Sequence, residues 1–97
     1  MHARVAWYDV PADRIDDAVD GFRAASAELA QIEGSEGGYL LIDRDEGRVL
    51  TVTLWESGAA MDASGARAAA LRRRAMETSD GQVGRVECFE VPVRFEP

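Results

Sequence analysis

Residues 38–57 contain the pattern that most restricts how this chain can fold. Two runs rich in β-branched and aromatic residues flank Asp43–Gly47, which predicts a β-hairpin whose turn uses a positive φ at Gly47. Side chains in a strand alternate between its faces, and both faces of this second run are bulky: Val49, Thr51, Thr53 and Trp55 on one, Leu50, Val52 and Leu54 on the other. A strand that is apolar on both faces has to be covered twice. We therefore expect the chain's own helices on one face and a second copy of the chain on the other.

The segments before the hairpin predict one strand and one helix. Imperfect alternation of apolar residues indicates a strand over 3–10. Apolar residues then recur at three- and four-residue steps over 15–32, as in an amphipathic helix, and Asp13 with Asp16 is expected to cap its start. Residues 33–38 are rich in glycine and predict a loop.

The segments after the hairpin predict a second helical region and a last strand. Ser57 is expected to cap the helix, and Ser64-Gly65 to interrupt it. Residues 85–95 predict a strand. Because Pro92 has no N–H to donate, we expect the end of this strand to lie at a sheet edge or to form an arm. The order βαββαβ with right-handed crossovers predicts a single α+β domain over 1–97, ferredoxin-like, with a four-stranded antiparallel sheet and two helices on one face.

Composition excludes several functions. A net charge of -7 argues against nucleic acid and anionic membranes as partners, because both require a cationic surface. The chain has no lysine, one histidine and one cysteine, which excludes Schiff-base chemistry, the usual zinc clusters and a redox pair of cysteines, so no metal is expected. No apolar run is long enough to cross a bilayer and no signal pattern begins the chain, so we expect a cytoplasmic protein.

Several single residues carry competing interpretations. Arg4 interrupts a buried strand, and either anchors an anionic group or, as is commoner, reaches solvent. The run Arg72–Arg74 is expected to form a solvated helix face, opposite the apolar side. Cys88 is expected to be an inert core thiol. Of Tyr8 and Tyr39, at most one is a credible proton donor, because a buried tyrosine needs a hydrogen-bond partner.

The run Gly-Gly-Tyr-Leu at 37–40, a charged turn, and then Val49–Ser57 leading into a helix resembles the antibiotic biosynthesis monooxygenase superfamily. The resemblance covers nearly the whole chain and implies a dimeric α/β barrel, a homodimer paired through its open sheet faces. It also implies a cofactor-independent monooxygenase, with no metal or flavin, acting on an aromatic or polyketide-like small molecule. The haem-degrading members use a helix histidine, whereas the single His2 lies at the terminus here, so haem degradation is not expected.

The resemblance also implies a pocket between sheet and helices. Trp55 falls at the family's strand tryptophan, Thr51 stands where an Asn is expected, Met61 stands where a Tyr is expected, and Arg74 lies near an expected Arg. Trp7 and Tyr39 are further aromatic candidates, and each aromatic could instead fill the core. No catalytic residue is assigned. Thr51 and Met61 favour the alternative function, a non-catalytic ligand-binding or dimerisation module of the same fold.

Overall fold

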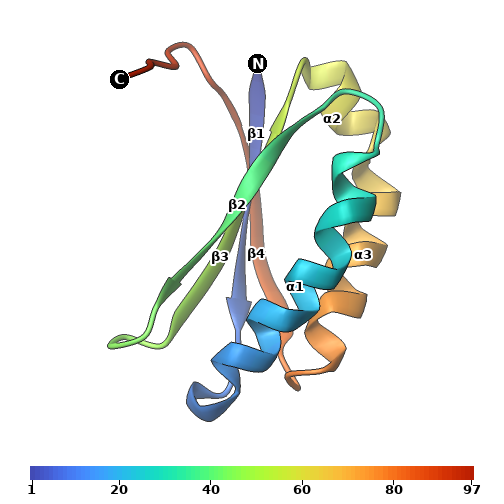
Figure 1. The fold of residues 1–97 in the computed structure, drawn as a ribbon. Helices are drawn as coiled ribbons and strands as arrows, with labels where there is room; N and C mark the ends of the chain where they lie inside the picture. The colour runs from blue at the N-terminus through green and yellow to red at the C-terminus, as the bar shows by residue number, and fades with distance from the viewer.

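The computed structural model describes all 97 residues. The elements in chain order are β1 (His2–Asp9), the 3-10 turn η1 (Ala12–Arg14), α1 (Ile15–Ala30), β2 (Ser35–Asp43), β3 (Arg48–Trp55), α2 (Gly58–Ala63), α3 (Gly65–Glu77) and β4 (Gln82–Glu90). The strands form one antiparallel sheet in the order β2-β3-β1-β4, and all helices lie on one side of it (Figure 1). This confirms the predicted ferredoxin-like α+β fold. None of its helices is long and apolar enough to cross a membrane.

The β2–β3 hairpin forms as predicted. Gly47 adopts φ 65°, which is in the left-handed region that glycine tolerates. Asp43 closes the turn, because its carboxylate accepts a hydrogen bond from the Glu46 backbone N–H at 3.1 Å and pairs with Arg48 at 2.8 Å. The hydrogen bond from Arg48 lowers the pKa of Asp43. The turn therefore fixes the register in which Thr51 lies opposite Leu40.

Several predicted boundaries were wrong. Strand β4 spans Gln82–Glu90 rather than 85–95, and α1 ends at Ala30 rather than at 32. Strand β2 begins at Ser35, within the predicted loop, because pairing with β3 continues past an irregularity between Ser35 and Gly38. Asp13 does not cap α1: it lies in η1, and Arg14 occupies the position before the helix without a capping hydrogen bond. The tertiary pairing of β3 extended the strand beyond what local sequence favours.

Ser57 caps α2 as predicted, and its hydroxyl accepts a hydrogen bond from the Ala60 backbone N–H at 3.0 Å. The helical region is interrupted at Ser64, after which α3 begins at Gly65. The Ser64 side chain does not cap α3, since it donates to the Met61 carbonyl at 2.6 Å. The predicted second helix is therefore two helices, α2 and α3.

Gly21 lies where the backbone of α1 closely approaches α3. A Cβ at this position would lie 2.2 Å from the Ala75 carbonyl oxygen and 3.0 Å from the Thr78 hydroxyl. No side chain fits that space, so the absence of a Cβ allows the two backbones to approach.

The core between sheet and helices consists of two clusters of buried residues. The larger contains Ala6, Tyr8, Ile15, Ala18, Phe22, Ala25, Val49, Ala75 and Met76. The smaller contains Ile32, Trp55, Met61 and Leu71. These side chains come from the inward positions of β1 and β3 and from the apolar sides of the helices, as strand alternation and helical periodicity predict.

The opposite face of the sheet has no helix over it (Figure 1). Alternation places Trp7, Leu50 and Val52 on this open face, together with Leu41 and Phe89, which remain exposed. The Arg85 guanidinium lies over the Trp7 ring, 4.0 Å from its centroid. A monomer thus presents a broad apolar surface to solvent.

Candidate functional site

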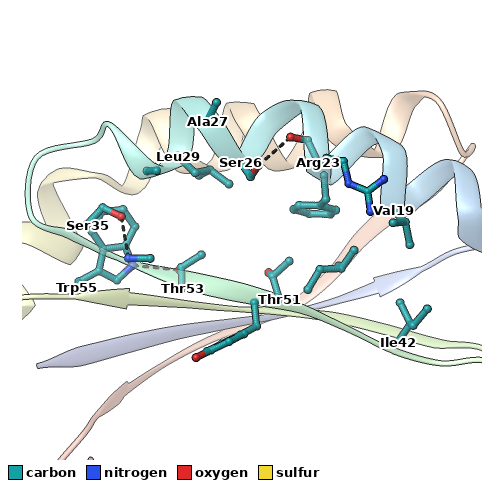
Figure 2. A pocket seen from close by; sticks show the side chains of 16 residues that line it. Val19, Arg23, Ser26, Ala27, Leu29, Ser35, Ile42, Thr51, Thr53 and Trp55 are labelled. Atoms are coloured by element: carbon teal, nitrogen blue, oxygen red, sulfur yellow. Dashed lines mark hydrogen bonds between the residues drawn. The ribbon is translucent and has the colours of Figure 1, made fainter.

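A cavity of about 680 Å³ lies between α1 and the β2–β3 half of the sheet. Its α1 wall is formed mainly by apolar residues, and Thr51 and Thr53 extend from β3 toward the helix (Figure 2). The lining residues on which the following argument depends are Phe22, Arg23, Ser26, Thr51, Thr53 and Trp55. A volume of this size with a mostly apolar wall and a few polar groups is typical of a small-molecule site.

The polar groups of the cavity are held by hydrogen bonds. The Thr51 hydroxyl lies 2.8 Å from the hydroxyl of Tyr8, which is buried behind it. The Thr53 hydroxyl accepts a hydrogen bond from the Trp55 Nε1–H at 3.0 Å (Figure 2). Each threonine is therefore oriented by an aromatic neighbour. The Thr53 hydroxyl also donates to the Arg4 carbonyl at 3.5 Å, so it can only accept a further hydrogen bond from a ligand, whereas the Thr51 hydroxyl can still donate one.

The Tyr8 phenol keeps its proton in this setting. Burial raises its pKa to about 12, and the hydrogen bond with Thr51 and the positive charge of Arg72 oppose that rise. The Phe22 ring packs edge-on against it at a centroid distance of 5.1 Å. The phenol is therefore neutral at physiological pH.

Three of the residues predicted for the pocket, Trp55, Thr51 and Tyr39, border this cavity, but Tyr39 lies opposite Val52 in the sheet, so alternation places its side chain on the open face. The structure combines the two interpretations of Trp55: it lines the cavity, yet it is only 1% exposed and packs in the smaller core cluster. Tyr39 is 64% exposed. Of the two tyrosines, Tyr8 has the buried hydroxyl with a partner that a proton donor requires.

The other three, Trp7, Met61 and Arg74, do not line the cavity. Trp7 lies on the open face of the sheet, because β1 directs its neighbours Ala6 and Tyr8 toward the helices. Met61 fills the smaller core cluster. Arg74 is on the surface of α3 and pairs with Glu28 of α1 at 2.7 Å.

The α1 wall and Thr53 were not among the predicted site residues. Thr53 shares a strand face with Thr51 and Trp55, so the period-two alternation of 49–55 could have included it. The α1 residues carry no such signal, because helical periodicity identifies an apolar side but not which part of it leaves space.

The cavity offers no recognisable metal or haem ligand set. No group of three His, Cys, Asp or Glu residues is close enough to hold a metal ion. Neither histidine nor cysteine lines the cavity, and His2 instead packs against Gly58. These residues do not fit a haem iron, which in proteins is usually ligated by imidazole or thiolate.

Three single-residue expectations were wrong on the α3–β4 side of the sheet. Arg4 does not reach solvent: it is 6% exposed and donates hydrogen bonds to Ser64 Oγ at 3.2 Å and to the Met61 carbonyl at 2.7 Å. Arg73 and Arg74 are exposed on α3 as expected, but Arg72 is buried, with 9% of its surface exposed. Cys88 is exposed, because β4 is an edge strand.

Comparison of the whole chain with solved structures identifies its fold. The haem degrader MhuD of Mycobacterium tuberculosis, solved with two haems in its active site, superposes with a TM-score of 0.77 and 25% identity over 99% of this chain and 100% of that one. SnoaB, a cofactor-independent oxygenase of Streptomyces nogalater, superposes with a TM-score of 0.75 and 16% identity, over 99% of this chain and 97% of that one. A Deinococcus radiodurans protein provisionally named an antibiotic biosynthesis monooxygenase superposes with a TM-score of 0.76 and 13% identity, over 100% of this chain and 98% of that one.

The protein has the antibiotic biosynthesis monooxygenase fold. Proteins with this fold thus include a haem degrader and a cofactor-independent oxygenase. No family model matches the sequence. Two uncharacterized proteins of Mycobacterium tuberculosis, MT2634 and Rv2557, are each 32% identical to it over 82 residues, 81% of this chain. The chain spans about a third of the length of these relatives (36%).

Proposed function

We propose that this protein is a cofactor-independent monooxygenase that binds an aromatic or polyketide-like molecule in the cavity beneath α1. The observation that supports it best is the pair of oriented threonine hydroxyls, Thr51 and Thr53, in an otherwise mostly apolar cavity of about 680 Å³. Such a lining suits a flat molecule with an apolar ring system and one or two phenolic oxygens. SnoaB, a cofactor-independent oxygenase, has the same fold.

In the proposed reaction the substrate supplies its own electrons. A phenolic ring activates a neighbouring methylene group, which loses a proton, and the resulting anion reduces O2 and forms a C–OOH bond. Loss of water from this hydroperoxide leaves a carbonyl group, so one methylene group and one molecule of O2 give one ketone carbonyl and one water. The protein has to orient the ring, stabilise the anion and limit the access of water.

The residues of the cavity fit the stabilisation of an anion better than the removal of a proton. Thr51, backed by the neutral phenol of Tyr8, can donate a hydrogen bond to a phenolate oxygen. The exposed guanidinium of Arg23 also lies at this cavity, where it pairs with Asp20 at 3.7 Å. No carboxylate or imidazole lines the cavity, so the proton is released to water at its mouth.

That same lack of a base favours a second candidate function, ligand binding without turnover. Without a proton acceptor, the cavity could hold a phenolic or aromatic molecule and leave it unchanged. Both functions predict that a ligand binds in the cavity, but only the monooxygenase function predicts that O2 is consumed.

Both functions can be tested with a variant that closes the mouth of the cavity. Ser26 and Ala24 are both exposed on α1, but only Ser26 lines the cavity. Ser26→Trp should therefore block it, and Ala24→Trp is the matched control. Each protein is incubated with a panel of hydroxylated polycyclic compounds, while O2 uptake and thermal stability are measured.

The monooxygenase hypothesis predicts O2 uptake above a protein-free control in the wild type and Ala24→Trp, lost in Ser26→Trp, with a product that has gained one oxygen and lost two hydrogens. Ligand stabilisation without uptake supports binding alone. If no compound changes either quantity, or if Ser26→Trp behaves like its control, the cavity is not the site of function.

We also infer that two copies pair through the open sheet face. The support is the apolar surface there, on which Leu41 is 45% and Phe89 47% exposed, together with the small size of the chain. Sedimentation of wild type, Leu41→Glu and the helix-face control Ala24→Glu tests this. We expect dimers for wild type and control and monomers for Leu41→Glu, and a monomeric, folded wild type at micromolar concentration would refute the pairing.

A further inference from the structure

We propose that Arg72 forms a binding site for a small oxyanion, a carboxylate or a phosphate, on the α3–β4 side of the sheet. The site is separate from the cavity beneath α1, whose lining includes neither Arg72 nor Arg4. This inference does not depend on the proposed monooxygenase function.

Arg72 is a buried cation without a partner. It is 9% exposed, its Nε–H is fully buried without an acceptor, and it makes no hydrogen bond or ion pair with any residue. Burying an unpaired charge is costly, and buried arginines in proteins are normally paired or hydrogen-bonded. Desolvation also lowers the pKa of Arg72, which is what an uncompensated buried guanidinium experiences.

Two other arginines lie near Arg72. After desolvation, the positive charges of Arg4 and Arg73 also lower the pKa of Arg72. Arg4 is 6% exposed and forms no ion pair either, since its two hydrogen bonds go to Ser64 and Met61. Two buried guanidinium groups therefore share one region with no carboxylate to balance them.

An anion can reach this region from solvent. The two terminal Nη atoms of Arg72 are not fully enclosed, in contrast to its Nε, and the adjacent Cys88 is exposed on the edge strand. The planar fork of a guanidinium matches the two oxygens of a carboxylate or a phosphate, which can accept two parallel hydrogen bonds. In a chain of net charge -7, nonspecific attraction of anions is weak, so a bound oxyanion indicates a local site.

The test compares sodium phosphate and sodium benzoate with sodium chloride at equal ionic strength, by thermal shift and isothermal titration. Five proteins are used: wild type, Arg72→Met, Arg72→Lys, Arg73→Met and the cavity variant Ser26→Trp. Arg73 is the matched control, because it is the neighbouring arginine on α3 and is exposed. Phosphate and benzoate as separate arms distinguish the two oxyanion classes.

We expect at least one oxyanion to stabilise wild type and Arg73→Met beyond the effect of chloride. Arg72→Met should weaken that binding at least about tenfold, and Arg72→Lys should weaken it less, because it keeps the charge and loses the fork. Without added anion, Arg72→Met should be at least as stable as wild type, because it removes an unpaired buried charge.

Three results would overturn the proposal. The first is that neither oxyanion stabilises the wild type more than chloride does. This result is expected if a second copy of the chain, rather than an anion, balances the charge of Arg72. The second is equal weakening in Arg73→Met, which would indicate general surface attraction. The third is that Ser26→Trp abolishes the binding, which would place the oxyanion in the cavity beneath α1.

Discussion

The hydroxyl groups of Tyr8 and Thr51 lie 2.8 Å apart, and this contact joins a buried side chain near the end of β1 to the wall of the cavity. The two residues are 43 positions apart in the chain and lie on neighbouring strands, facing the helices. Because Tyr8 is buried, its hydroxyl depends on Thr51 for a partner. The contact therefore matters both for stability and for the polarity of the cavity.

Replacing Thr51 by the isosteric valine should leave the buried Tyr8 hydroxyl without a partner. We expect Thr51→Val to lower the free energy of unfolding by about 1–3 kcal/mol, measured by urea denaturation. In the background of Tyr8→Phe the same change should cost much less, because no unpaired hydroxyl remains. Equal costs in both backgrounds would mean that the two residues do not interact.

Tyr8 should also make the protein sensitive to high pH. Its pKa is raised from 10.0 in the unfolded chain to about 12 in the fold, so its contribution is fully present below pH 10 and is lost as pH rises toward 12. A difference of this size corresponds to roughly 2–3 kcal/mol of unfolding free energy. The measurement is unfolding free energy against pH for wild type and Tyr8→Phe. The difference between their curves should fall across this window, and parallel curves would contradict the assignment.

Gly21→Ala should destabilise the protein even though alanine favours helices. The added Cβ would meet the Ala75 carbonyl oxygen at 2.2 Å, so α1 and α3 must separate, at a cost of about 1–3 kcal/mol. The gain in helix propensity from glycine to alanine, about 1 kcal/mol, opposes this cost. Ala24→Gly, at an exposed position of α1, measures the size of that propensity difference in this helix. A thermal melt in which Gly21→Ala is more stable than wild type would show that the helices are not in close contact there.

Ser57→Ala should weaken the start of α2. The variant loses the acceptor for the Ala60 backbone N–H, and we expect a loss of about 1 kcal/mol in unfolding free energy. Ser57→Asp restores an acceptor at the same position and should remain close to wild type. If both variants lose the same amount, the cap contributes nothing and the serine matters for another reason.

Local patterns were sufficient for most of the fold. The hairpin turn at Gly47, the cap at Ser57 and the interruption at Ser64 each depend on residues close together in sequence, and each was confirmed. The early start of β2 at Ser35 could not be predicted this way, because it depends on pairing with Trp55 of β3.

The candidate site was only partly predictable. Thr51 and Trp55 were expected to line it through the resemblance, and both do, because the period of two places them on the same face of β3. Met61 and Arg74 were expected there through resemblance, and the helix rotations instead placed one in the core and the other on the surface. Which side of a helix faces a cavity depends on how the helix packs.

The sequence by itself therefore determined the order of strands and helices, the two apolar faces of β3 and the net negative charge, because these follow from residue periodicity and composition. Only the tertiary structure decided that Arg72 is buried while Arg73 is exposed, and that Tyr8 meets Thr51. Those outcomes depend on contacts between distant segments, which come together only when the helices pack on the sheet.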